Sequence, residues 1–272
     1  MSAMSTEHPP GSTPHDLTEL LHSRLDRIEA LLVGGAGPDQ SDTGAVAAPP
    51  TRPKPVWNTE TETEQRWAVT VVILIAVALQ LFLPARLSIH PRWMMPALEV
   101  SLLVALAAMN PHRRIDRSSR LLRALSLALA AAISLTNGWS AVKLVHDLVH
   151  GGGGTGALAL LGTGGAVWAT NVIAFALWYW EWDRGGPGAR ARATADYPDF
   201  LFPQMQQQGV APADWEPGFL DYLYVAYTNA TAFSPTDTMP LSLWAKLLMM
   251  LQSAVSLLTV VLVVARAVNI LQ

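Results

Sequence analysis

The stretch F-L-D-Y-L-Y-V-A-Y-T-N-A-T-A-F-S-P-T-D-T-M-P occupies residues 219–240, and a long apolar run follows it to the last residue. Over residues 219–231 the pattern predicts an aromatic-rich helix. At a rise of 1.5 Å per residue, this helix is too short for the ~20 residues that a membrane crossing needs. The stretch with Ser234 and Pro235 is irregular, and such backbone is tolerated at membrane depth only where protein or water surrounds it. The order of segments therefore predicts a re-entrant loop packed against a final spanning helix.

This order of segments resembles the pore domain of potassium channels. The sequence of residues 221–231 is similar to their pore helix, D-T-M-P at 237–240 is similar to the G-D-x-x-P stretch after their filter, and V-L-V-V-A-R-A-V at 261–268 is similar to the end of their inner helix. The resemblance implies a homo-oligomeric, channel-like protein that conducts monovalent ions. The whole of 57–272 also resembles an uncharacterised family of bacterial, actinobacterial-type integral membrane proteins, which implies no activity.

The segment in the place of the selectivity filter departs from the potassium-channel pattern. Potassium channels have T-V-G-Y-G there, whereas this chain has A-F-S-P-T. Glycines let successive carbonyl groups point at the pore axis, while a residue with a Cβ resists those backbone angles and proline fixes its own φ. We therefore expect weak or unknown selectivity, or a sealed constriction. The pore- and filter-like residues are Thr231, Ala232, Phe233, Ser234, Pro235, Thr236 and Asp237.

The composition is that of a membrane protein with several spans. Of the 272 residues, 51% are hydrophobic and 14% are charged, and the apolar residues gather in long runs. We expect a multi-pass protein of the cell membrane, with the lipid bilayer as its surroundings. The net charge of −3 offers no basic face for nucleic acid, and the absence of cysteine excludes disulfides and thiolate metal sites.

We predict an all-α fold with about five transmembrane helices and one re-entrant helix. The first 66 residues form a mostly disordered tail with an amphipathic helix at about 16–33, for which a membrane surface and a short coiled coil are the alternatives. A connecting loop at 183–218 precedes the pore-like segment and final helix at 219–272. The four spans of the membrane domain 67–182 are predicted at 67–83, 93–109, 121–142 and 157–182.

Several residues in these spans have a functional and a structural interpretation. Glu99 lies inside an apolar run, which favours either proton or cation handling or a pairing with a neighbouring helix. His146 and His150 share a helix face near Asp147; they form either a metal site or, as we expect, an interfacial end where Lys143 pairs with Asp147. We predict no metal site and no cofactor.

Glycines at 162, 164 and 165 are predicted to allow close helix approach, and Asn171 is predicted to form a hydrogen bond with a neighbouring helix. The run G-G-G-G-T-G at 151–156 fits a dinucleotide fingerprint, but no strand precedes it, so we interpret it as a turn.

The final helix, predicted over 241–271, carries a polar stripe at helical spacing. The stripe consists of Gln252, Ser256, Thr259 and Arg266, with Val263 on the same face. Two interpretations remain open for it. The stripe lines a water-filled path, or it joins helices through hydrogen bonds worth ~0.6 kcal/mol each.

Orientation follows from the arginines at 110–123, which mark a cytoplasmic loop. Two spans separate this loop from the pore-like segment, which conflicts with the orientation of potassium channels. The alternatives are a pore loop that enters from the cytoplasm, as in glutamate-receptor channels, a miscounted span, and a resemblance that is only packing; we expect the inverted loop. No nucleophile–base or metal constellation converges on one region, and we expect no enzyme. The sequence thus leaves two functions, a channel-like pore with a degenerate filter and a non-conducting membrane scaffold that keeps a pore-like fold.

Overall fold

The computed structural model describes residues 24–25, 67–109, 119–150, 156–206, 211–212, 215–232 and 237–271. The chain divides into two units, Met1–Arg52 and Pro53–Gln272. In the first unit Arg24 and Leu25 are described, and both are helical. The rest of the predicted tail and its helix lies outside the described residues, as do 110–118 of the arginine-rich loop, the glycines at 151–154 and filter-like residues 233–236.

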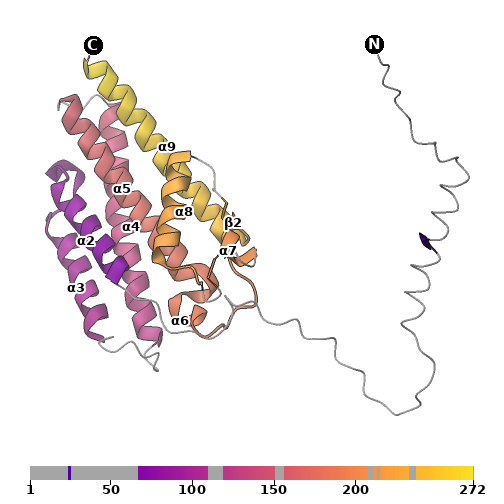
Figure 1. Ribbon diagram of the computed structural model, residues 1–272. Helices are drawn as coiled ribbons and strands as arrows, with labels where there is room; N and C mark the ends of the chain where they lie inside the picture. Colours follow the sequence, from indigo (N-terminus) through magenta and orange to yellow (C-terminus); the bar gives the residue numbers. More distant parts are fainter. Residues whose placement is uncertain are drawn as a thin grey trace, which may run out of the picture. The chain divides into compact units, whose positions relative to one another are not determined.

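The second unit is a bundle of helices (Figure 1). Its main helices are α2 (Trp67–Phe82), α3 (Met94–Met109), α4 (Ser119–Val149), α5 (Ala157–Trp182), the shorter α8 (Phe219–Ala232) and α9 (Leu243–Leu271). Short elements fill the connections: η2 (Ala85–Leu87), η3 (Asp183–Gly185), α6 (Pro187–Arg190), β1 (Phe200–Leu201), α7 (Pro203–Gln206) and β2 (Met239–Pro240). The helical class is confirmed, with one minimal antiparallel pair in which Phe200 lies opposite Pro240.

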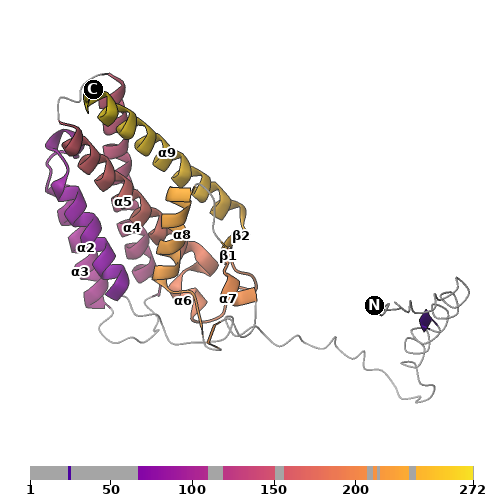
Figure 2. The same ribbon diagram turned by 45° about the horizontal axis from the view of Figure 1, so that its top comes forward.

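Within the described part of the chain, three helices are long and apolar enough to cross a membrane: Arg120–Val149, Ala157–Arg190 and Leu243–Leu271. The helices α2 and α3 are apolar but shorter. The helices α2, α3, α4, α5 and α9 alternate in direction, whereas α8 runs in the same direction as α9, as Figures 1 and 2 show. The connection between α2 and α3 therefore lies at the same end of the bundle as the C-terminus of α9, and the connection between α5 and α8 lies at the other end.

Local sequence explains where α5 stops. Arg184 takes a left-handed conformation (φ 52°), and Gly185 and Gly186 follow with φ of 81° and 94°. A Cβ at Gly186 would lie 2.7 Å from the backbone oxygen of Glu181, so this tight reversal requires glycine. Pro187 then occupies the first turn of α6, where its missing N–H costs nothing.

The helix of the predicted third span continues past its apolar part. The apolar span was predicted over 121–142 with a helical extension beyond it, and α4 runs without a break to Val149, so the polar residues after 142 belong to the same helix. Asp147 lies 3.7 Å from Arg86 and 3.8 Å from His146, whereas a pair with Lys143 was predicted. The rings of His146 and His150 stack with centroids 4.2 Å apart. Among the described residues, no group of three or more histidine or acidic side chains is placed to hold a metal ion.

The glycines of α5 differ in their surroundings. A Cβ on Gly164 would lie 2.7 Å from both γ-carbons of Val263 on α9, so this glycine sets the approach of the two helices. A Cβ on Gly162 or Gly165 would meet nothing within 4 Å, so the prediction of close approach is wrong for those two positions.

Replacing Gly164 with alanine should therefore lower the free energy of unfolding by about 1–3 kcal/mol, because the added methyl group forces α5 and α9 apart. The matched variant Gly165→Ala should leave stability unchanged or raise it by up to ~1 kcal/mol, since alanine favours the helix and the site is open. Chemical denaturation in detergent, monitored through tryptophan fluorescence, measures the free energy of unfolding of both variants. Equal stabilities for the two variants would contradict the close contact.

Candidate functional site

The short helix α8 is held between α5 and α9 at one end of the bundle (Figure 1). The chain enters α8 after Gly218, whose N–H donates to Asp221 Oδ2 at 2.8 Å. This is the reciprocal half of a capping box and begins the helix at a defined residue. After α8 the chain comes back to β2, which pairs with β1 of the α5–α8 connection. The chain thus leaves α8 toward the same end of the bundle at which it entered.

A buried glutamine joins the three helices. Gln252 of α9 is fully buried, and its Oε1 accepts hydrogen bonds from the Tyr179 hydroxyl of α5 at 2.6 Å and from Asn229 Nδ2 of α8 at 2.8 Å. Its Nε2 donates to the backbone oxygen of Ala226 at 2.8 Å. Asn229 also receives a hydrogen bond from Ser253 at 3.1 Å. The last turns of α8 are therefore fixed against the first half of α9.

A second polar link joins α4, α5 and α9. Asn171 donates to Ser256 Oγ at 3.1 Å, and its Oδ1 lies 3.4 Å from Asn137 Nδ2. The predicted hydrogen bond of Asn171 to a neighbouring helix is confirmed. All three side chains are buried, so these bonds replace water in the middle of the bundle.

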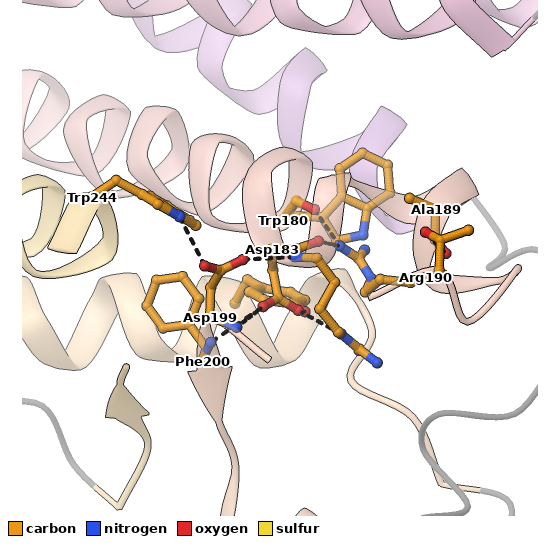
Figure 3. A network of polar contacts seen from close by, with 10 residues as sticks. Trp180, Asp183, Ala189, Arg190, Asp199, Phe200 and Trp244 are labelled. Atoms are coloured by element: carbon orange, nitrogen blue, oxygen red, sulfur yellow. Dashed lines mark hydrogen bonds and ion pairs between the residues drawn. The ribbon is translucent and has the colours of Figure 1, made fainter. Parts of the chain in front are cut away.

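The end of α5 is tied to α8 and to the connection by a buried carboxylate, Asp183 (Figure 3). Its Oδ1 accepts the backbone N–H groups of Asp199 at 2.9 Å and Phe200 at 3.2 Å. Its Oδ2 accepts the Tyr222 hydroxyl of α8 at 2.6 Å and Arg184 Nε at 3.1 Å. These four hydrogen bonds offset the cost of burying a charged carboxylate that is fully removed from solvent.

Asp199 and Arg190 extend this Asp183 junction to α9 and back to α5. Asp199 Oδ2 accepts the backbone N–H of Arg184 at 2.8 Å, and its Oδ1 accepts the Trp244 indole N–H of α9 at 2.9 Å (Figure 3). The Arg190 guanidinium donates to the backbone oxygens of Trp180 and Asp183. It also lies 5.2 Å from the centre of the Tyr222 ring, a cation–π contact.

An aromatic cluster surrounds the Asp183 junction. The Phe200 ring centre lies 5.1 Å from that of Tyr179, 6.1 Å from Tyr222 and 5.7 Å from Trp244. These edge and tilted arrangements are favourable for aromatic pairs. The connection that the sequence predicted as a loop is thus packed against the helices at its start, residues 183–190, and near its middle, residues 199–202.

The filter-like residues are only partly described. Thr231, in the last turn of α8, is exposed, and its hydroxyl bonds to the Tyr227 and Thr228 backbone oxygens of its own helix. Ala232 ends α8, and Asp237 is exposed beyond it. The residues between them, 233–236, lie outside the described part of the chain.

The predicted polar stripe faces the interior of the same chain. Gln252, Ser256 and Thr259 are buried, with exposed fractions of 0–2%. Arg266 is half-buried, and its Nε has no hydrogen-bond partner among the described residues. The exposed face of α9 is apolar instead, with Leu243, Leu247, Met250, Leu257, Val261 and Val264.

Several residues of this site had no signal in the sequence. Asp183 and Asp199 are widely separated in a connection that showed only an acidic excess and several prolines and glycines, and Tyr179 stood out only as part of an interfacial aromatic run. Asn229 fits a glycosylation sequon, which its burial in α8 makes irrelevant. Their roles appear only when α5, α8 and α9 come together.

The arrangement fixes a short helix in a rigid frame, with its C-terminal end inside the length of the bundle. Because a helix C-terminus carries partial negative charge, such an end stabilises a nearby cation. Comparisons with protein-family models, with curated proteins and with solved structures found no match to this chain.

Proposed function

We propose that this protein is a multi-pass, homo-oligomeric membrane protein in which α5, α8 and α9 form a pore module that conducts monovalent cations with weak selectivity. The observation that carries the proposal is the re-entrant path of α8. The Gln252 and Asp183 contacts hold this helix at both of its ends. A helix that enters a bilayer without crossing it needs such support, since its backbone ends are otherwise exposed to lipid.

The proposed protein crosses the membrane five times, through α2, α3, α4, α5 and α9. A pore then needs several copies, because the module of one chain has its polar groups turned inward. The exposed side chains of α8 and α9 offer a surface for such copies: Leu220, Tyr224 and Tyr227 on α8, together with the apolar face of α9. Tyrosine and large apolar side chains are typical of tightly packed subunit contacts.

Flux through the purified, full-length protein in liposomes tests the proposal. We expect cation flux with little discrimination between potassium and sodium, because residues 232–236 lack the glycines of a carbonyl filter. A potassium-to-sodium permeability ratio on the order of a hundred, as carbonyl filters reach, would contradict weak selectivity. Absence of flux from an assembled oligomer would contradict conduction itself.

A charge at the end of α8 provides a variant for the same assay. Thr231→Arg should lower cation flux severalfold, because a positive charge beside the helix C-terminus repels cations. The matched control Thr194→Arg places the same charge on an exposed residue of the α5–α8 connection and should leave flux unchanged. Equal flux in both variants would mean that the conducted ions do not pass the C-terminal end of α8.

The orientation of the module is a further prediction. With five crossings, Arg120 and Gln206 lie on the cytoplasmic side and Ser88 on the other. The chain has no cysteine, so single cysteines at these positions can be probed in whole cells with a membrane-impermeant thiol reagent. We expect labelling of Ser88→Cys alone. Labelling of Gln206→Cys without Arg120→Cys would mean an odd number of crossings between them, which places the pore-like segment outside as in potassium channels.

A non-conducting scaffold is the second candidate, and the inward-facing stripe favours it. Gln252 and Ser256 are engaged in hydrogen bonds between helices of one chain, and the exposed face of α9 is apolar. A pore lined by that face would dewet readily and oppose ion passage. The liposome assay decides between the candidates, since a scaffold forms the oligomer without flux.

A further inference from the structure

A buried acid lies on α3, away from the pore module. Glu99 is 0% exposed, and Gln80 of α2 and Thr136 of α4, both almost fully buried, face its carboxyl group. Thr136 Oγ1 lies 3.3 Å from Glu99 Oε1 and 2.8 Å from the backbone oxygen of Ala132. A hydroxyl group has one hydrogen, and the shorter contact to a carbonyl oxygen takes it. A hydrogen bond between Thr136 Oγ1 and Glu99 Oε1 must then use a proton carried by Glu99.

Three buried polar atoms around the Glu99 carboxyl group have no hydrogen-bond partner among the described residues: Glu99 Oε2, Gln80 Oε1 and Gln80 Nε2. An ionised carboxylate so buried would need a cationic partner. The helix α2 has no titratable side chain, and α3 has none besides Glu99. On α4 the nearest are Arg123 and Lys143, which lie toward its two ends. A carboxylic acid matches these surroundings, since one O–H gives Glu99 a donor toward either Thr136 or Gln80.

A polar track leads from this acid to the end of the bundle where α2 and α3 connect. Ser140 Oγ lies 3.0 Å from the backbone oxygens of both Thr136 and Leu87. Thr136, Ser140 and Asp147 follow one another at helical spacing on α4, and Asp147 meets Arg86 beside Leu87. Polar groups on this face of α4 therefore extend from Glu99 to the Arg86–Asp147 pair.

We propose that Glu99 is a proton-binding site inside the membrane that exchanges its proton with water at the α2–α3 end along the Thr136–Ser140 track. In the bound state the carboxyl group is neutral and donates its O–H to Gln80 or Thr136. In the released state the O–H bond breaks, the electron pair stays on the carboxylate, and the proton leaves to water at that end. The site is independent of conduction by α8.

An apolar carbodiimide tests the bound state, because it adds to protonated carboxyl groups in apolar surroundings. The carboxyl proton goes to one carbodiimide nitrogen, the oxygen bonds the central carbon, and rearrangement leaves a stable N-acylurea with no leaving group. The full-length protein in liposomes, treated with dicyclohexylcarbodiimide, should gain one adduct that peptide mass mapping places on Glu99. Labelling should slow as the pH rises, and Glu99→Gln should lose the adduct.

Other outcomes of the labelling overturn the proposal. An adduct count unchanged by Glu99→Gln, or the absence of any Glu99 adduct across the pH range in which the protein stays folded, would exclude a protonated site. Protection of Glu99 by sodium or lithium at constant pH would assign the site to a metal cation instead of a proton. Mapping in the unmodified protein makes the test valid even where Glu99→Gln does not fold.

The track has its own readout in the infrared band of the neutral carboxyl group, which Glu99→Gln removes. After a jump to alkaline pH, this band should decay severalfold more slowly in Ser140→Ala than in the natural chain. Ser101→Ala is the matched control, because Ser101 is exposed on α3 and its one hydrogen bond among the described residues is to the Ala97 oxygen of its own helix. Equal decay in the two variants would overturn the Thr136–Ser140 route. None of these measurements depends on ion flux, so their failure and the failure of the pore proposal are distinguishable.

Discussion

Replacing Asp183 with asparagine is expected to lower the free energy of unfolding by about 3–5 kcal/mol, the largest effect of any single change considered in this chain. The asparagine amide keeps an oxygen for the Asp199 and Phe200 N–H groups, but its NH₂ meets the donors of Tyr222 and Arg184. The Arg184 side chain, 3% exposed, also loses its ion pair with the carboxylate. Unfolding by denaturant in detergent, followed through the ten tryptophans, measures the loss.

The matched control for this prediction is Asp196→Asn. Asp196 lies in the same connection and is exposed, so the identical chemical change should alter stability by no more than ~0.5 kcal/mol. If Asp183→Asn and Asp196→Asn unfold at the same denaturant concentration, the buried carboxylate does not hold the α5–α8–α9 junction together. The chain reversal at Arg184, Gly185 and Gly186 would then have to be stable without it.

Replacing Gln252 with leucine is expected to cost about 2–3 kcal/mol. Leucine is similar in size and keeps the apolar packing of α9, but it removes the acceptor of the Tyr179 hydroxyl and of Asn229. Tyr179 is fully buried, so its hydroxyl would be left without a partner, which costs ~1–3 kcal/mol for each such group. The loss of the Gln252 bond to Ala226 also frees the end of α8, and limited proteolysis should cut the chain faster after α8.

Gln206→Leu serves as the control for Gln252. Gln206 is exposed at the end of α7, and its replacement should leave both the unfolding midpoint and the rate of proteolysis unchanged. A Gln252→Leu protein as stable as the natural chain would mean that the glutamine is not the link between α5, α8 and α9. The polar stripe would then be free to face water, as its other interpretation requires.

The helices themselves were predictable because membrane helices are defined by local properties of the chain. Residues 67–83, 93–109 and 157–182 correspond closely to α2, α3 and α5, since apolar length and flanking proline, glycine or tryptophan act over a few residues. The short helix predicted at 219–231 is α8, extended by one residue. The apolar span predicted at 121–142 and its polar helical extension form the single helix α4.

By itself, the sequence determined the helical class, the apolar helices and the short helix before the last one. The tertiary structure alone decided which face of each helix is inside. Spacing placed Gln252, Ser256 and Thr259 on one side of α9, but only the packing of α5 and α8 against that side shows that it is buried. Asp183, Asp199 and Tyr222 meet although they are far apart in the chain, and the distinction between Gly164 and Gly165 depends on Val263 of another helix. The reason is that periodicity is a property of one segment, whereas burial and hydrogen bonding between helices depend on partners that the segment does not contain.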